Sequence, residues 1–242
     1  MTKKHRISIM VLILSISTYL LVSTQKKELE DDRFVTYIVN PKKKKVTFFW
    51  KNENNENFKN AKNLKSWLAQ HKKQLIFATN GGMYKKDGSP QGLYIENRKT
   101  KQKIDTANGN GNFYLKPNGI FYITADQLPH ICSTQKFIDN GIVQYATQSG
   151  PMLVINGEIH SSFKEKSTNV NIRNGVGILP DNRIVFAISK KEINFYDFAN
   201  YFKKLGCKNA LYLDGFVSRT YLPEKKWIQT DGEFGVIIAV TK

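Results

Sequence analysis

Cysteine and acidic residues are the scarce residue types in this sequence. Cys132 and Cys207 are the only two cysteines in 242 residues, too few for a disulfide framework, although the two can pair in an exported protein or stay reduced. Asp and Glu number 20 against 37 Lys and Arg, which gives a formal net charge of +17. No zinc-finger spacing, basic helix or aromatic RNA-binding signature accompanies this charge, so we expect no nucleic-acid partner. A positive field equally suits anionic phospholipids or a phosphate-bearing substrate.

Several motifs of catalysis and metal binding are also missing. No Gly-x-Ser-x-Gly elbow surrounds Ser149, which argues against a Ser-His-Asp hydrolase. His130 and Cys132 have no matching pair of ligands elsewhere, and the chain contains no EF-hand loop. We therefore expect no cofactor and no dedicated metal site, while a divalent cation held by Asp214 and a neighbour stays open.

The first 24 residues have the layout of an export signal. Basic residues precede an almost unbroken apolar run, Ile7 to Val22, and polar residues return at Ser23. This pattern predicts a signal peptide, or a signal anchor that keeps the protein on a membrane through this segment. We expect an extracytoplasmic location, in the periplasm or cell envelope or secreted. Residues 25–45 then form a charged connector that can contain a first strand at 34–39, and residues 46–242 form the main domain.

The main domain has the pattern of the α+β class. Short apolar stretches separated by glycine-rich turns predict many strands, and two segments have helical spacing. Phe58 to Leu68 form one helical stripe; Phe195 to Leu205 form the other, with Asn194 as N-cap and Gly206 as the stop. Residues 117–119 and 181–182 read as hairpin turns. We expect one strand-rich, mixed-sheet domain with two main covering helices and an N-terminal hydrophobic segment before it.

Candidate functional residues lie where predicted strands give way to turns. The apolar run Ala210 to Leu213 leads into Asp214 and Gly215, which presents a carboxylate at a sheet rim or merely ends a strand. Arg173 has the planar guanidinium suited to phosphate. The other polar breaks supply backbone donors or polar side chains; they are Asn80, Gly81 and Gly82, then Lys116 and Asn118, then Gln148, Ser149 and Gly150.

Five stretches in this order and wording resemble the phosphodiester glycosidase family. They are "ATNGGMYKKDGSPQGLYIEN", "GNFYLKPNGIFYI", "ATQSGPMLVINGEIH", "RNGVGILPDNRIVFAIS" and "NFYDFANYFKKLGCKNALYLDG". The resemblance covers about Val46 to Val240 and is nearest to the uncharacterised bacterial branch, rather than to the animal uncovering enzyme. It implies a hydrolase that releases a sugar from a sugar-1-phosphodiester, leaving a phosphomonoester.

The resemblance also implies roles for the candidate residues. Asp214 becomes the reactive carboxylate, as a base or as the anion facing an oxocarbenium-like centre, and Arg173 stabilises the departing phosphate. The remaining residues become substrate-binding groups; they are Asn80, Gly81, Gly82, Lys116, Asn118, Gln148, Ser149, Gly150, Gly215, Phe216 and Ser218.

One position departs from the family pattern. Relatives typically read Asp-Gly-Gly at this turn, whereas Phe216 follows Asp214 and Gly215 here. A phenyl ring can stack on a sugar face, or it can crowd the site and mark a protein that has lost activity. The alternative function is therefore a non-catalytic envelope protein that binds anionic or phosphorylated glycans.

Overall fold

The computed structural model describes residues 31–214 and 217–242. The N-terminal hydrophobic segment and the Gly215-Phe216 pair, both used in the sequence interpretation, lie outside the described residues. Residues 34–242 form one compact unit. Within the described part of the chain, no helix is both long enough and apolar enough to cross a bilayer.

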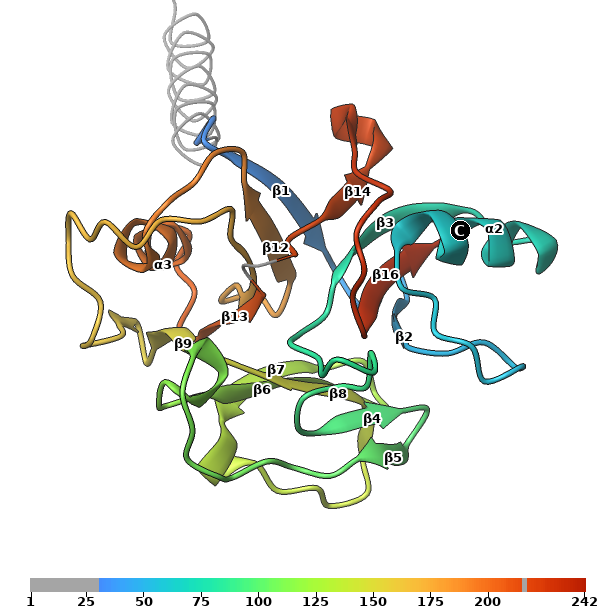
Figure 1. The fold of residues 1–242 in the computed structure, drawn as a ribbon, viewed down its shortest axis with the longest axis horizontal. Helices are drawn as coiled ribbons and strands as arrows, with labels where there is room; N and C mark the ends of the chain where they lie inside the picture. Colours follow the sequence, from blue (N-terminus) through green and yellow to red (C-terminus); the bar gives the residue numbers. More distant parts are fainter. Residues whose placement is uncertain (1–30, 215–216) are drawn as a thin grey trace, which may run out of the picture. The chain divides into compact units, whose positions relative to one another are not determined.

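Three sheets build the compact unit (Figure 1). The first runs in the order β1-β12-β11-β13-β9-β10, the second in the order β15-β14-β3-β16-β2, and the third in the order β5-β4-β8-β6-β7. The first contains β1 (Phe34–Val39), β9 (Met152–Ile155), β10 (Glu158–Ile159), β11 (Asn174–Ile178), β12 (Ile184–Ser189) and β13 (Ala210–Asp214). The second contains β2 (Val46–Phe49), β3 (Leu75–Asn80), β14 (Thr220–Leu222), β15 (Trp227–Ile228) and β16 (Ile237–Thr241). The third contains β4 (Tyr94–Glu96), β5 (Lys99–Gln102), β6 (Gly119–Thr124), β7 (Pro129–Ser133) and β8 (Val143–Ser149).

Every strand pairing within these sheets is antiparallel in the described residues. The strand-rich α+β class is confirmed, but the mixed sheet of the sequence interpretation is replaced by three antiparallel sheets. The reason is connectivity: parallel neighbours need long crossover connections, usually helical, and this chain has only two substantial helices in its described part.

The two main helices form where their apolar stripes predict them. Helix α2 (Ala61–Gln70) begins at Asn60, whose side chain accepts a hydrogen bond from the backbone N–H of Asn63. Helix α3 (Phe195–Lys204) begins at Asn194 in the same way and ends before Gly206, which has φ of +83°. Helix α2 packs beside the second sheet and α3 beside the first (Figure 1). Three short 3₁₀ turns complete the helical elements; they are η1 (Asn112–Tyr114), η2 (Thr134–Lys136) and η3 (Pro223–Lys225).

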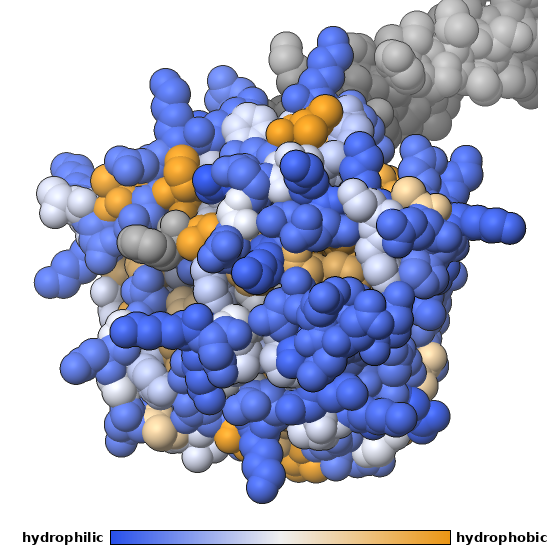
Figure 2. Space-filling view, turned by 45° about the vertical axis from the view of Figure 1, so that its right-hand side comes forward, coloured by the Kyte–Doolittle hydropathy of each residue, from blue (hydrophilic) through white to orange (hydrophobic). Residues whose placement is uncertain are grey.

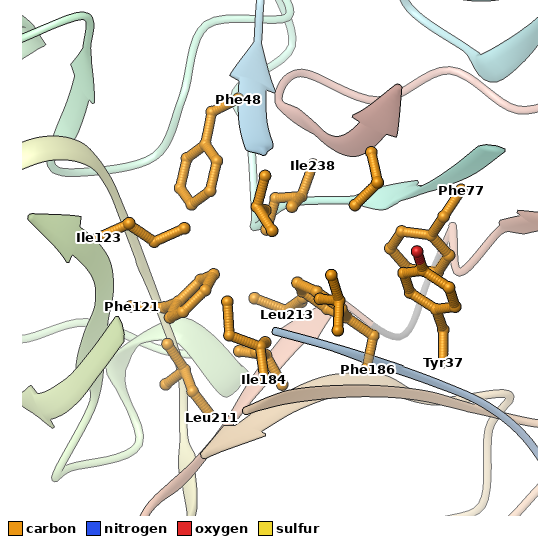
Figure 3. Close-up of a cluster of buried hydrophobic side chains, with 14 of the residues drawn as sticks. Tyr37, Phe48, Phe77, Phe121, Ile123, Ile184, Phe186, Leu211, Leu213 and Ile238 are labelled. Carbon is orange, nitrogen blue, oxygen red and sulfur yellow. The ribbon is translucent and has the colours of Figure 1, made fainter. Parts of the chain in front are cut away.

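The main core lies between the three sheets. Phe48, Phe77 and Ile238 come from the second sheet and point toward residues of the other two sheets (Figure 3). Phe121 and Ile123 enter from the third sheet, whereas Ile184, Phe186, Leu211 and Leu213 enter from the first. Burying this apolar surface is the dominant favourable term in folding, so the three sheets stabilise one another.

The structure also settles the two predicted hairpins and the start of the domain. The turn at Asp181 and Asn182 joins β11 to β12, as predicted. The hairpin at residues 117–119 is wrong: η1 precedes this turn in place of a strand, because Phe113 turns inward to a buried position. The first strand expected at residues 34–39 forms as β1, which pairs along its whole length with β12 and begins the compact unit.

The two cysteines are free thiols in the structure. Burial raises the pKa of Cys132 to about 11 and that of Cys207 to about 12. Both sulfurs are therefore protonated near neutral pH, which makes them poor nucleophiles and poor metal ligands.

Candidate active site

Asp214 lies at the end of β13, in the middle of the first sheet between β11 and β9. The four preceding residues are fully buried, and Asp214 itself is 7% exposed. Ala210 and Tyr212 face the cluster beneath α3, while Leu211 and Leu213 face the main core. A bulge in the pairing with β11, between Tyr212 and Asp214, interrupts this alternation, and the Asp214 charge lies close enough to raise the pKa of the Tyr212 phenol. The apolar run thus presents a nearly buried carboxylate at the end of a central strand.

Asn174 is the residue that fixes this strand end. Its Oδ1 accepts hydrogen bonds from the Asp214 backbone N–H at 3.0 Å and from the Ser218 hydroxyl at 3.2 Å. Its Nδ2 donates to the hydroxyl oxygen of Thr79 at 3.0 Å and to the side-chain oxygen of Asn80 at 3.1 Å. Asn174 is 1% exposed, so these bonds form away from water. One amide therefore joins the ends of β3, β11 and β13.

Asn80 and Ser218 belong to the same hydrogen-bond network. The Asn80 side-chain oxygen accepts from the backbone N–H of Arg219 at 3.0 Å. The Ser218 hydroxyl also lies within hydrogen-bond distance of the backbone oxygens of Ile172 and Asp214, which compete with Asn174 for its single proton. Both side chains are buried. Their contacts hold the chain on either side of the Asp214 turn, so we assign them to positioning the turn.

The glycine pair after β3 packs tightly beside this network. The backbone N–H of Gly81 donates to the backbone oxygen of Val236 at 2.7 Å. It is therefore not the free N–H donor for an anion that the sequence suggested. The Gly81 carbonyl accepts from the Thr147 hydroxyl at 2.7 Å. Gly82 has φ of +143°, and a Cβ there would lie 2.9 Å from that hydroxyl oxygen. These glycines are required by close packing of the backbone.

Arg173 is fully buried on the α3 side of the first sheet. Its Nε donates to the backbone oxygen of Ile193 at 2.8 Å, and its Nη2 donates to that of Asn169 at 2.9 Å. The guanidinium carbon lies 3.6 Å from the ring centroid of Phe195, and Nη1 donates to the Tyr212 hydroxyl at 3.2 Å. None of the ion pairs among the described residues includes Arg173. A buried positive charge thus lies beside Tyr212, on the α3 side of the sheet, although the side chain does not reach solvent.

Tyr212 connects Arg173 with the strand that carries Asp214. Burial raises the pKa of the Tyr212 phenol, the Asp214 charge raises it further, and the guanidinium of Arg173 opposes both effects. The phenol is therefore neutral at physiological pH and accepts the hydrogen bond from Arg173. Sequence reasoning treated Tyr212 as part of an apolar run; its position two residues before Asp214 was the available signal.

The predicted residues around Gly150 are mainly structural. Ser149 donates from its hydroxyl to the backbone oxygen of Leu213 at 2.8 Å, beside Asp214. Gln148 is occupied by backbone groups, since its Oε1 accepts from the N–H groups of Leu93 and Asp105 at 2.9 Å each. Its Nε2 donates to the backbone oxygen of Asp105 at 2.6 Å. Gln148 therefore fastens the 103–116 segment to the third sheet and has little capacity left for a ligand.

Lys116 lies at the end of that segment, and Asn118 directly precedes β6. The Lys116 ammonium donates to the side-chain oxygen of Asn108 at 2.6 Å and remains exposed. Asn118 donates to the backbone oxygen of Phe113 at 3.0 Å, and a Cβ on Gly150 would lie 2.7 Å from the Asn118 Cβ. None of their hydrogen bonds within the described residues involves the Asp214 network.

Comparison with known proteins gives this arrangement a family. The phosphodiester glycosidase family model matches residues 73–236, which is more than half of the chain. The chain is also 39% identical over 195 residues to the uncharacterised protein YigE of Escherichia coli (strain K12), covering 77% of this chain and 73% of that protein. The chain belongs to the phosphodiester glycosidase family. The resemblance seen in the sequence is thereby confirmed.

The fold of this phosphodiester glycosidase family member also resembles that of solved structures with low sequence identity to it. One is the zebrafish N-acetylglucosamine-1-phosphodiester alpha-N-acetylglucosaminidase catalytic domain, auto-inhibited by a pro-peptide, with a TM-score of 0.56 and 15% identity over 86% of this chain and 83% of that one. Another is an exported protein of Burkholderia pseudomallei K96243, described as putative, with a TM-score of 0.54 and 9% identity over 86% of this chain and 73% of that one. At these identities the likeness concerns the fold alone.

Tyr84 is a residue near Asp214 that was not among the candidates predicted from the sequence. Its hydroxyl donates to the backbone oxygen of Glu233, and the adjacent Met83 packs against the cluster that contains Tyr212. Burial raises the pKa of Tyr84, and the charges of Asp214 and Glu233 raise it further. The segment after the glycine pair therefore passes near Asp214. No group of three or more His, Cys, Asp or Glu side chains placed to hold a metal ion occurs in residues 31–214 and 217–242.

Proposed function

We propose that this chain hydrolyses the glycosidic bond of a sugar-1-phosphodiester, releasing a free sugar and a phosphomonoester. Membership of the phosphodiester glycosidase family supports the reaction class. The observation that carries the assignment of the reactive group is Asp214, a nearly buried carboxylate at the end of a central strand. Its backbone is fixed by Asn174, so the carboxylate starts from a defined position.

The chemistry needs only one carboxylate in this position. Ordinary glycosidases use a second carboxyl group to protonate a poor alkoxide leaving group, whereas a phosphodiester leaves as a stabilised anion. Water attacks the anomeric carbon, the bond from this carbon to the bridging oxygen breaks, and the electron pair departs with the phosphate. Asp214 accepts the proton of the water, or faces the positive anomeric centre while that proton passes to solvent.

Arg173 contributes through its charge and through Tyr212. Its guanidinium is buried beside Tyr212 without an ion pair among the described residues, so its field is weakly screened by water. A positive field there favours an anionic substrate in the same region. The hydrogen bond from Nη1 to the Tyr212 hydroxyl also orients the Tyr212 ring, two residues before Asp214 in the strand. We therefore assign Arg173 as a positioning and electrostatic residue.

The sugar phosphodiester or phosphorylated glycan that we propose as substrate lies outside the cytoplasm. This location rests on the N-terminal sequence, where basic residues precede the apolar run Ile7 to Val22. The same segment either directs export and is removed, or holds the protein on the membrane. A non-catalytic glycan-binding protein is the competing function, favoured by Phe216 in place of the family's glycine.

The test is release of reducing sugar from a panel of sugar-1-phosphodiesters that includes UDP-N-acetylglucosamine. The full chain is compared with Asp214→Asn, which keeps the shape of the side chain and removes its charge. Asp181→Asn is the matched control, because Asp181 lies in an exposed hairpin turn and its ion pair with Arg183 is local.

We expect sugar release by the full chain and by Asp181→Asn, and a fall of at least about a hundredfold in Asp214→Asn. Equal release by Asp214→Asn removes Asp214 from the mechanism. Saturable, salt-sensitive binding of the panel without any release of sugar supports the glycan-binding protein instead.

A further inference from the structure

The outer face of the third sheet lacks the helical cover that the other two sheets have. Its apolar cluster consists of Leu93, Ile95, Ile120, Val143 and Ala146. Within the described residues both main helices pack elsewhere (Figure 1). The segment 134–142 covers part of this face, since the ring of Phe137 packs edge-on against Tyr122 with centroids 5.3 Å apart.

This segment ends in an apolar loop, residues 136–142, that we call the isoleucine loop. Ile138 is 79% exposed and Ile142 is 47% exposed, and Ile138 is the most exposed large hydrophobic residue in the described part of the chain. The face that Figure 2 shows is mostly hydrophilic, with small separate apolar spots. Two exposed isoleucines four residues apart on one loop are therefore a local feature that needs a reason.

The loop is held in place by hydrogen bonds. The Arg98 Nη2 donates to the backbone oxygen of Gly141 at 3.1 Å, and the backbone N–H of Ala125 donates to the backbone oxygen of Ile142 at 2.8 Å. The Gly141 N–H donates to the Asp139 carboxylate at 2.9 Å. The first two contacts tie the C-terminal end of the loop to the third sheet, and the packing of Phe137 on Tyr122 holds the N-terminal end.

Positive charge surrounds the loop. Arg98 and Lys99 lie at the β4–β5 turn, and the guanidinium of Arg98 contacts the loop. Lys136 is the first residue of the loop. All three side chains are exposed. None of the ion pairs among the described residues includes them. Asp139 is the one acidic residue within the loop, and its carboxylate accepts the Gly141 N–H. The tip is therefore apolar apart from Asp139. The rim carries three basic residues against one acidic residue, Asp126, which follows the Ala125 that donates to the backbone oxygen of Ile142.

We propose that the isoleucine loop docks on the surface of a bilayer that contains anionic phospholipids. Ile138 and Ile142 enter the boundary between head groups and acyl chains, where aliphatic side chains leave water. Arg98, Lys99 and Lys136 face the anionic head groups. The net charge of +17 attracts the whole protein to the same surface. This docking is separate from the proposed hydrolysis and from the N-terminal segment.

The test measures amide hydrogen exchange of residues 136–142 in the full chain. Vesicles of phosphatidylglycerol and phosphatidylcholine in equal parts are compared with vesicles of phosphatidylcholine alone. A local readout is needed because the N-terminal hydrophobic segment can bind both kinds of vesicle. We expect slower exchange in the loop on the anionic vesicles only, and loss of this protection in high salt.

Two variants make the test specific. Ile138→Ser is expected to weaken the docking by about tenfold, because most of the apolar side chain that leaves water is removed. Ile228→Ser is the matched control: Ile228 is 61% exposed but lies on β15 of the second sheet, so protection of the loop stays unchanged. Both sites are exposed, and neither substitution disturbs a packed core.

Three outcomes overturn the proposal. The first is unchanged exchange in the isoleucine loop on anionic vesicles, and the second is equal protection on neutral vesicles or in Ile138→Ser. The third is the same protection by soluble dextran sulfate, which identifies the loop as part of a polyanion-binding surface that needs no bilayer.

Discussion

Replacing Asn174 by alanine removes the side chain that joins three strand ends beside Asp214. Its amide makes hydrogen bonds of 3.0 to 3.1 Å with Thr79, Asn80 and the Asp214 backbone. Each such bond contributes about 1 kcal/mol net, and the buried Asp214 N–H is left without this acceptor. We expect the free energy of unfolding to fall by about 3 kcal/mol, and the melting temperature by about 6–12 °C for a domain of this size.

The measurement is urea unfolding followed by tryptophan fluorescence, with calorimetry as an independent check. Asn110→Ala is the matched control, because Asn110 is exposed and we expect a change within about 0.5 kcal/mol. A loss below about 1 kcal/mol in Asn174→Ala, or an equal loss in the control, would show that water replaces the amide and that the network does not hold the strand end.

Three further predictions concern packing, capping and pH. Gly82→Ala brings a Cβ to 2.9 Å from the Thr147 hydroxyl at φ of +143°, so we expect a loss of about 1–3 kcal/mol in urea unfolding; a neutral result would mean that the turn relaxes freely. Asn194→Ala removes the N-cap bond to Asp197 and should lower stability by about 1 kcal/mol, whereas Asn194→Ser should keep most of it. Burial lowers the pKa of His160, so the unfolded chain binds a proton before the folded one as pH falls below about 6.5, and stability declines from there toward the folded pKa. His160→Gln should flatten the fall in melting temperature between neutral and mildly acidic pH, and an unchanged slope would assign that fall to other groups.

Local features of the sequence predicted the elements that depend on local physics. The apolar run Ala210 to Leu213 followed by Asp214 predicted a buried strand with a carboxylate at its end, and β13 has this form. Helix α3 followed from an apolar stripe, the Asn194 cap and Gly206, all within about a dozen residues. These signals are strong because the interactions that create them are short in sequence.

The parts that sequence reasoning missed depend on pairing between distant segments. Asn174 gained its role because β11 meets β3 across 94 residues, and no local pattern indicates that meeting. Gln148 was assigned to the substrate but binds backbone groups 43 residues away at Asp105. Gly81 was expected to offer a free backbone N–H to a ligand. This N–H instead donates to the backbone oxygen of Val236, the residue just before β16. Polar residues at strand ends mark a region well, yet their partners are set by tertiary structure.

The position of β16 has a consequence for when the protein can fold. This strand follows all the others in the sequence, yet it lies in the middle of the second sheet, between β3 and β2. Until residues 237–241 have left the ribosome, β2 and β3 therefore lack the neighbour that joins them, and the core between the sheets stays open. Such long-range closure slows folding and keeps a growing chain loose. This order of closure is compatible with the export that we propose from the N-terminal sequence, because a chain must stay unfolded to be threaded through a translocation channel.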